Sequence, residues 1–391
     1  MTISTLGIIG SGQLGSLLCQ AAKKLNIKTV VISDDENGPA QNYSGEFIYS
    51  QYDNKEKIKE FVSKVDIITY EFENIPINIL NEIDKEKKVL PKPEINRIIQ
   101  NRKLEKTFVN DLGIKTTDWA FIKQAEDVEK NKNLLPGILK SNTLGYDGHG
   151  QYVLNSLDDV KKNWCFTADY ILEKKVNLKK EISVVITRYL NGETYIYEPI
   201  ENIHKDQILN HSKIPADINK EIFAKAQNNA KLISEKLDYV GTMCVEYFID
   251  QDDNLLVNEI APRVHNSGHL TINAFSISQF SGHVAAVCNL GVKKVEKISN
   301  AEMFNVLGKD IETYRSKTFG KNEFTDFFGD LYRATETGRA QGAGVDEALE
   351  LMIKGKKEKI LLYWRGSKID LSNRLLLTIN GRCKCYPDIG T

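Results

Sequence analysis

The sequence contains little of what would tie it to an oxidising compartment, a membrane or nucleic acid. Six of its 391 residues are cysteine, without a C-x-x-C pair or a zinc-type Cys/His cluster, so we expect reduced, structural thiols. No apolar run approaches the roughly 20 residues of a membrane helix, and no basic, apolar leader opens the chain. Lys and Arg total 52 against 53 for Asp and Glu, which leaves no excess positive charge for nucleic acid. We therefore expect a cytoplasmic protein that binds neither membranes nor nucleic acid.

The length, in contrast, exceeds what one hydrophobic core usually supports, so more than one domain is expected. Strand-like and helical segments alternate over residues 1–98, which predicts a parallel, Rossmann-like α/β domain. Prolines at positions 91 and 93 predict the linker out of it. Residues 99–292 then form a second domain, and residues 293–391 a small β-rich third domain with an atypical tail after about residue 331.

Hydrophobic periodicity predicts several elements that place polar residues. A helix at 16–25 follows a glycine-rich loop, one helix runs from residue 95 to about 112, and a long amphipathic helix covers 219–236. Strands at 239–249 and 254–260 are separated by a polar turn, which predicts a β-hairpin. This hairpin brings Glu246 and Glu259 close to each other.

The first glycine loop has the spacing Gly10-x-Gly12-x-x-Gly15, with Asp34 near the end of the next predicted strand. Glycines at the start of a helix allow the backbone to approach a phosphate closely. Three interpretations remain open from these residues: NAD binding, an anionic group of another ligand, or glycines needed only for packing.

A second loop, residues 145–151, has three glycines between the predicted strands 137–140 and 151–154. This composition favours a mobile hairpin flap over a polyphosphate, with Lys140 supplying a positive charge beneath it. The alternative is a plain β-turn with a surface lysine.

The third constellation combines the two hairpin glutamates with a polar run that begins at Arg263. Paired carboxylates suit magnesium, which takes its other ligands from phosphates, although solvated strand carboxylates are the alternative. The run from Arg263 to His269 is rich in hydrogen-bond donors and has no amphipathic period, so it indicates an anion-recognition loop. Zinc binding by His265 and His269 is a further alternative.

Taken in order, four motifs resemble 5-(carboxyamino)imidazole ribonucleotide synthetases over roughly residues 5–290: Gly-Gln-Leu-Gly at 12–15, Tyr-Glu-Phe-Glu-Asn at 70–74, Gly-Tyr-Asp-Gly-x-Gly-Gln at 145–151 and Asn-Glu-Ile-Ala-Pro-Arg-x-His-Asn-Ser-Gly-His at 258–269. The resemblance implies an ATP-grasp fold of mixed α/β and α+β type, in which two subdomains clamp ATP and residues of about 115–178 form the flap subdomain. It also implies that the Rossmann-like domain helps to hold a ribonucleotide, which removes the NAD interpretation.

The resemblance assigns roles to individual residues. The implied ATP site comprises Arg102, Lys140, Gly145, Tyr146, Asp147, Gly148, His149, Gly150, Gln151, Glu173, Lys174, Lys175, Val176, Glu181, His204, Asn258 and Glu259. The implied ribonucleotide site comprises Gln13, Leu14, Glu73, Tyr146, Asp147, Arg263, His265, Asn266 and Ser267. Glu246 and Glu259 are the implied magnesium ligands, and Lys140, Asp147 and Arg263 the implied catalytic residues.

The implied reaction uses ATP, Mg²⁺ and bicarbonate to carboxylate the amine of 5-aminoimidazole ribonucleotide through carboxyphosphate, in purine biosynthesis. A homodimer and a partner mutase of the same pathway are also implied. Alternatives within the fold are a formate-using ribonucleotide transformylase or a biotin-type carboxylase, and an inactive nucleotide-binding homologue is the alternative of another class.

Three features depart from the family pattern. His149 stands where the family usually has Arg or Lys, and the expected adenine hinge, residues 173–176, is more basic than usual. The basic residues that the family carries near the C-terminus are mostly missing from residues 332–345, through divergence or a frame change. Loss of charge-assisted hydrogen bonds there predicts weaker binding of the ribonucleotide phosphate.

Overall fold

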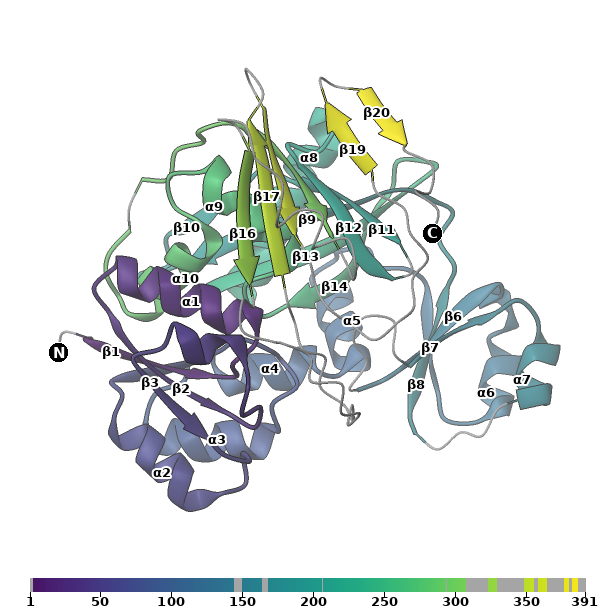
Figure 1. Ribbon diagram of the computed structural model, residues 1–391. Coiled ribbons are helices and arrows are strands. Elements are labelled where there is room, and N and C mark those ends of the chain that lie inside the picture. The colour runs from purple at the N-terminus through teal and green to yellow at the C-terminus, as the bar shows by residue number, and fades with distance from the viewer. Residues whose placement is uncertain are drawn as a thin grey trace, which may run out of the picture.

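The computed structural model describes residues 3–143, 150–163, 168–205, 207–292 and 294–306, and the strands at 323–328, 348–354, 358–363, 376–379 and 382–385. An N-terminal α/β layer lies beside a large central sheet, and a smaller lobe projects from the other side of that sheet (Figure 1). In this described part of the chain, no helix has the length and apolar character needed to span a bilayer.

The N-terminal layer is a parallel four-stranded sheet in the order β3-β2-β1-β4. Its elements are β1 (Thr5–Ile9), α1 (Gln13–Lys24), β2 (Lys28–Ser33), η1 (Pro39–Asn42), β3 (Glu46–Tyr49), α2 (Lys55–Ser63), β4 (Ile67–Tyr70) and α3 (Ile77–Glu86). The central strands are apolar and buried, as expected for a sheet covered on both faces. The predicted Rossmann-like sheet is confirmed, although α1 begins at Gln13, before the predicted residue 16.

The connection to the second domain differs from the prediction. Instead of one helix from residue 95, the chain forms α4 (Pro93–Ile99) and α5 (Arg102–Asp111). Pro93 starts α4 because proline is well tolerated in the first turn. The side chain of Asn101 then accepts a hydrogen bond from the Leu104 N–H at 3.1 Å and caps a new helix. The prediction of a single helix was wrong because this cap was not recognised.

The smaller lobe contains an antiparallel four-stranded sheet in the order β5-β8-β6-β7. Its elements are β5 (Trp119–Ile122), α6 (Ala125–Lys130), η2 (Lys132–Leu134), β6 (Gly137–Ser141), β7 (Gln151–Leu154), α7 (Leu157–Asn163) and β8 (Tyr170–Lys174). Helices α6 and α7 lie together beside this sheet (Figure 1). The lobe therefore has a small core of its own, which includes Leu139 and Leu172.

The central sheet has the order β14-β13-β9-β11-β12-β15-β18-β16-β17, with β10 paired to β9. Its elements and their neighbours are β9 (Leu178–Arg188), β10 (Thr194–Ile196), β11 (Ile200–Lys205), β12 (Ile208–Ile214), α8 (Lys220–Lys236), β13 (Gly241–Asp250), β14 (Leu255–Ala261), η3 (Asn266–Leu270), α9 (Thr271–Ala274), α10 (Gln279–Val287), β15 (Asn300–Asn305), β16 (Glu323–Phe328), β17 (Ala348–Lys354) and β18 (Glu358–Tyr363). A separate pair consists of β19 (Leu376–Ile379) and β20 (Arg382–Cys385). The predicted hairpin is β13 and β14, and it makes Glu246 and Glu259 cross-strand partners.

The N-terminal layer and the central sheet share one hydrophobic core. Helix α1 lies alongside α10 (Figure 1), and Leu18, Phe280 and Val284 belong to one cluster of buried side chains. A buried histidine joins the same two parts. His283 Nδ1 accepts the Thr242 N–H at 3.0 Å, so its Nε2–H donates to Thr69 Oγ1 at 2.8 Å. This arrangement requires a neutral imidazole.

His283 should make stability depend on pH. Burial outweighs the Thr242 hydrogen bond and lowers the pKa of His283 from 6.5 to about 4. Between these values the unfolded chain binds a proton that the folded chain does not, so stability falls as pH falls. The full shift corresponds to about 3 kcal/mol. In urea titrations from pH 7 to pH 4, His283→Gln should be less stable than wild type at pH 7 but should lose less stability on acidification. Parallel curves for the two proteins would contradict this assignment.

Candidate active site

The small lobe and the central part of the molecule meet at three buried charged groups. Glu173 on β8 accepts contacts from Lys140 Nζ on β6 at 2.8 Å and from Lys106 Nζ on α5 at 3.1 Å. All three side chains are almost completely buried. Burial would raise the pKa of Glu173, but the two ammonium groups outweigh it and lower this pKa to about 2. Glu173 is therefore an ionised carboxylate that serves as the shared counterion of both ammonium groups.

Glu259 lies next to this charged group. Arg102 Nη1 is 3.3 Å from Glu259 Oε2, and the amide oxygen of the adjacent Asn258 is 3.4 Å from Lys140 Nζ. The Glu259 side chain is 41% exposed, whereas Arg102 is buried. The structure thus brings together Arg102, Lys140, Asn258 and Glu259, which the resemblance placed in one nucleotide site.

Two residues of this region were missed by the sequence reasoning. Glu105 is buried and its Oε1 accepts the Ile260 N–H at 2.6 Å, while Lys106 donates to the Asn258 carbonyl at 2.8 Å. Burial, against the opposing effect of Lys106 and Arg102, raises the pKa of Glu105 to about 7. Glu105 and Lys106 follow Arg102 on α5 at helical spacing, which puts the three side chains on one face of the helix. This was the available signal, but charged residues at such spacing usually mark a solvated face.

The second glutamate of the hairpin faces the donor-rich loop. Glu246 Oε1 is 3.0 Å from His265 Nε2, and the other ring nitrogen of His265 lies 2.9 Å from Ser267 Oγ. Burial disfavours the imidazolium, but Cys244 and Glu246 outweigh it and raise the pKa of His265 well above its ordinary value. Burial likewise opposes ionisation of Glu246, but His265 outweighs it and lowers the pKa of Glu246 to about 2. The pair is therefore ionic.

A buried hydroxyl and amide chain supports this loop from below. Ser267 Oγ lies 2.7 Å from Ser183 Oγ, Asn202 donates to Ser183 at 2.9 Å, and Ser212 donates to Asn202 at 2.8 Å. These four side chains are almost fully buried. Because every link has a partner, the chain fixes the position of Ser267 and, through it, the ring of His265.

His204 and Glu181, both assigned to the nucleotide, pair with each other through His204 Nδ1. Burial lowers the pKa of His204, but the hydrogen bond to Glu181 and the charge of Glu246 outweigh it, so that its pKa is raised. The pairing of β9 with β13 places Ser183 opposite Glu246, so Glu181, two residues before Ser183, lies on the same face of the sheet as Glu246. Among the described residues, no three His, Cys, Asp or Glu side chains form a group that could hold a metal by themselves.

Arg263 and Glu73, both assigned to the ribonucleotide, form a two-pronged ion pair between the domains. Arg263 Nε contacts one carboxylate oxygen and Nη2 donates to the other at 3.1 Å. Burial would raise the pKa of Glu73, but Arg263 outweighs it and lowers this pKa. The Glu73 carbonyl also accepts the Asn96 amide at 2.8 Å. The loop after β4, helix α4 and the donor-rich loop are thus held together at this point.

The first glycine loop carries a protein carboxylate. The amides of Gly12 and Gly15 donate to the two oxygens of Glu71, the second at 2.5 Å. Gly10 has a φ of +101°, and a Cβ there would lie 2.6 Å from Glu71 Cγ, so glycine is required. The interpretation expected an anionic group of another ligand, whereas here the loop amides bind a carboxylate of the chain itself. Glu71 was not among the predicted site residues.

The remaining predicted residues lie in different surroundings. Gln13 is buried at the start of α1, and its side-chain nitrogen has no hydrogen-bond partner among the described residues. Leu14 packs against the shared core. Asn266 begins η3, and His269 is buried against the ring of Phe280. Five flap residues, Gly145, Tyr146, Asp147, Gly148 and His149, lie outside the described residues, as do residues 329–347, which include the atypical segment 332–345.

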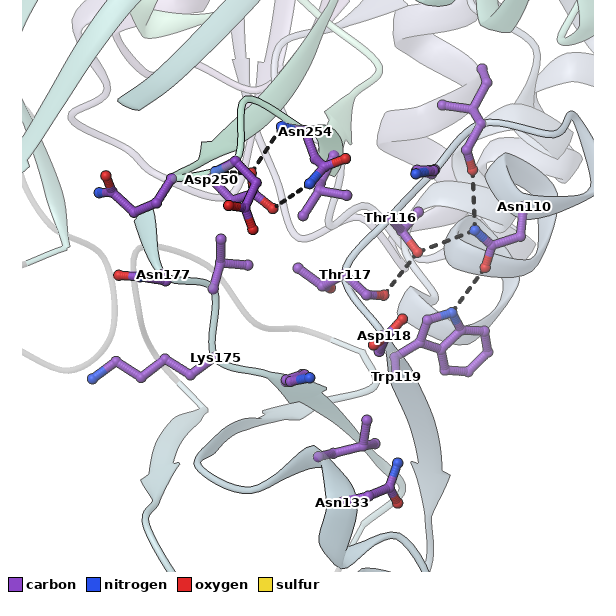
Figure 2. A pocket seen from close by; sticks show the side chains of 18 of the residues that line it. Asn110, Thr116, Thr117, Asp118, Trp119, Asn133, Lys175, Asn177, Asp250 and Asn254 are labelled. Atoms are coloured by element: carbon purple, nitrogen blue, oxygen red, sulfur yellow. Dashed lines mark hydrogen bonds between the residues drawn. The ribbon is translucent and has the colours of Figure 1, made fainter. Parts of the chain in front are cut away.

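The expected adenine hinge borders a recess of about 970 Å³ between the lobes. Lys174 and Lys175 donate their backbone amides to Asp118 and Pro136, each at 2.9 Å. Figure 2 shows Lys175 on one side of the recess, the Asp250–Asn254 turn above it, and Asn110 between Thr116 and Trp119. Lys140, Glu173, Glu246 and Glu259 do not line it. The recess therefore lies on the hinge but apart from the charged centre. At the flap itself, Gly150 has a φ of +75° and Gln151 pairs with Lys140.

Comparisons with known proteins agree with this architecture. A family model described as the ribonucleotide synthetase preATP-grasp domain matches residues 3–100, and one described as the ATP-grasp domain matches residues 107–280. The N5-carboxyaminoimidazole ribonucleotide synthase of Brucella melitensis is 38% identical over 332 residues, which are 83% of this chain and 92% of that protein. The synthase of Staphylococcus aureus is 36% identical over 369 residues, 93% of this chain and 97% of that protein.

Solved structures show the same likeness. N5-carboxyaminoimidazole synthetase from Staphylococcus aureus, complexed with ADP, superposes with a TM-score of 0.75 at 36% identity, covering 79% of this chain and 84% of that one. The synthase from Aspergillus clavatus, in complex with ADP and 5-aminoimidazole ribonucleotide, gives a TM-score of 0.76 at 27% identity, covering 84% of this chain and 89% of that one. The chain belongs to the N5-carboxyaminoimidazole ribonucleotide synthase family.

Proposed function

We propose that the protein uses ATP and bicarbonate to carboxylate the amine of 5-aminoimidazole ribonucleotide in purine biosynthesis, giving the carboxyamino ribonucleotide, ADP and phosphate. One observation carries this proposal. Of the two cross-strand carboxylates, Glu259 meets the cation Arg102, and Glu246 meets His265 of the donor-rich loop. The hairpin thus lies between the proposed binding site for the nucleotide phosphates and a second proposed anion-binding site. A relative that binds both ADP and 5-aminoimidazole ribonucleotide supports the same division.

On the nucleotide side, Arg102 and Lys140 are suited to phosphate oxygens, with Gly150 and Gln151 at the base of the flap. Lys140 is preorganised by its contact with Glu173. The hinge residues Lys174, Lys175 and Val176 would hold adenine, and Glu181 and His204 the ribose. The flap residues Gly145, Tyr146, Asp147, Gly148 and His149 would cover the phosphates and exclude water.

The hairpin carboxylates fit a magnesium ion. Mg²⁺ is commonly bound by one or two carboxylates together with substrate phosphates and water, and Glu246 and Glu259 lie opposite each other on one face of an antiparallel pair. The ion would offset negative charge on the transferred phosphoryl group.

On the ribonucleotide side, we assign Gln13, Leu14, Glu73, Arg263, His265, Asn266 and Ser267. The amide nitrogen of Gln13, which has no partner in the described part of the chain, and the guanidinium of Arg263 are donors suited to phosphate or hydroxyl oxygens. The Ser183–Ser267 contact keeps the loop in place without the ligand's help.

These assignments support the following reaction. A bicarbonate oxygen attacks the γ-phosphorus of ATP, and ADP leaves. Lys140 and Arg263 stabilise the negative charge of the carboxyphosphate. This intermediate splits into carbon dioxide and phosphate, the exocyclic amine bonds to the carbon, and Asp147 accepts the proton released from nitrogen.

The wider setting is also part of the proposal. We expect a cytoplasmic homodimer that works with the mutase of the same pathway, as the family resemblance implies. The partners are then small molecules and a second copy of the chain, with no nucleic acid or membrane.

The first prediction concerns the metal carboxylate. Glu259→Gln should reduce ATP cleavage by about 100-fold or more because a ligand of the charged transition state is lost. Its stability should change little, since a partly exposed ion pair usually contributes about 0–1 kcal/mol. Glu201→Gln is the matched control because Glu201 is an ion-paired carboxylate of the same sheet, 3.0 Å from Lys180. Wild-type turnover of Glu259→Gln at saturating magnesium would remove this residue from the metal site.

The second prediction separates the two substrate sides. Arg263→Ala should raise the KM for the ribonucleotide by about tenfold or more, because a two-pronged guanidinium contact is worth roughly 1.5–3 kcal/mol. ADP affinity, measured by calorimetry, should remain near wild type. Arg188→Ala is the control for the loss of a mostly buried, ion-paired arginine, here at the end of β9. A collapse of ADP affinity with an unchanged ribonucleotide KM would place Arg263 on the nucleotide side instead.

A further inference from the structure

Strand β14 has an irregularity next to Glu259. In its pairing with β13, Glu246 faces Glu259, but the next residue, Tyr247, faces Val257. Asn258 is therefore an extra residue on β14, which makes a β-bulge. A bulge turns the neighbouring side chains and breaks the regular ladder of hydrogen bonds. Here it controls the directions of Asn258 and Glu259, the two residues of β14 that we assign to the nucleotide site.

The outer edge of β14 has two kinds of partner: the Val257 N–H donates to the Lys115 carbonyl at 2.8 Å, whereas the peptide groups around Glu259 are bonded to a helix. Strand β14 is the last strand of the sheet on this side. Its Ile260 N–H donates to Glu105 at 2.6 Å, and its Asn258 carbonyl accepts from Lys106 at 2.8 Å. Two adjacent side chains of α5 thus provide the acceptor and donor that a neighbouring strand would supply. The peptide groups on both sides of Glu259 are fixed by them.

Lys106 connects the bulge to the opposite lobe as well. Its ammonium group lies 3.1 Å from Glu173, whose other oxygen contacts Lys140. Lys140 in turn lies 3.4 Å from the side-chain oxygen of Asn258. One buried ammonium group therefore touches both the strand that carries the metal carboxylate and the counterion of the phosphate-binding lysine.

A role limited to packing does not explain these residues. Glu105 and Lys106 are 2% and 1% exposed, and burying charged groups is costly unless each has a specific partner. The same helix also buries Val109, which would anchor it without charges. Instead, Glu105 and Lys106 bind the backbone on both sides of Glu259, and Lys106 also contacts the Glu173 carboxylate.

We infer that Glu105 and Lys106 are positioning residues for the metal–nucleotide complex: together they hold the β14 bulge so that Glu259 is presented to the divalent cation. The inference rests on one part of the proposed function, the assignment of Glu259 to the divalent cation of the nucleotide site. It adds two residues that act through Glu259 without touching the substrate.

The test compares binding of Mn²⁺·ADP with binding of ADP alone by calorimetry. Glu105→Leu and Lys106→Met should weaken Mn²⁺·ADP binding by about 10-fold to 100-fold, as expected when the support of a metal ligand is removed. Binding of metal-free ADP should change much less. Glu105→Gln should bind Mn²⁺·ADP much more tightly than Glu105→Leu, since its amide oxygen can still accept the Ile260 N–H. The electron paramagnetic resonance spectrum of bound Mn²⁺ should change in the two disruptive variants.

Lys103→Met is the matched control, because Lys103 lies on the same helix but is exposed. It should bind Mn²⁺·ADP as wild type does. If Lys106→Met does not fold, as judged by circular dichroism, the contrast between Glu105→Leu and Glu105→Gln decides the question.

Equal losses with and without Mn²⁺, or unchanged Mn²⁺·ADP binding in the folded variants, would overturn the inference. A wild-type protein that binds Mn²⁺·ADP but does not consume ATP with bicarbonate and 5-aminoimidazole ribonucleotide would overturn the proposed function and leave the inference standing. Absence of Mn²⁺·ADP binding by the wild type would overturn both.

Discussion

The carboxylate of Glu173 lies between the ammonium groups of Lys106 and Lys140, and the geometry of the site that we assign to the nucleotide depends on this contact. Glu173 and Lys140 belong to the small lobe, while Lys106 belongs to α5 beside β14. All three are buried, so removal of one leaves an uncompensated charge, which typically costs roughly 3–5 kcal/mol. The three groups therefore act as one unit. Their positions determine both where Lys140 points and how α5 meets the strand that carries Glu259.

Other polar groups around the proposed site are paired in the same manner. Arg263 is paired with Glu73, His265 with Glu246, and the amides of the first glycine loop with Glu71. Each pairing solves the problem of burying polar groups in a medium of low polarity. It also holds each group in one orientation, which favours recognition of an anion of matching shape over anions in general.

The sequence was sufficient for several parts of this picture. The alternation of strands and helices predicted the parallel N-terminal sheet, and the apolar pattern around a polar turn predicted the β13–β14 hairpin with Glu246 near Glu259. Sequence reasoning failed where a local cap or a long-range contact decided the outcome. Asn101 divides the helix predicted from residue 95, and Glu71 reaches the glycine loop from a strand 56 residues further along the chain.

Glu105 and Lys106 show which features local sequence determines and which features only tertiary packing determines. The sequence by itself determined that Arg102, Glu105 and Lys106 share one helix face, because helical periodicity is a local property. It could not determine whether that face is solvated or buried, since this depends on which strand packs against it. The tertiary structure decided this by placing the edge of β14 there, 155 residues away from Glu105 at the Ile260 contact. Local spacing therefore determined the elements and the family motifs, whereas the partners of the buried charges were decided only by the packing of distant segments.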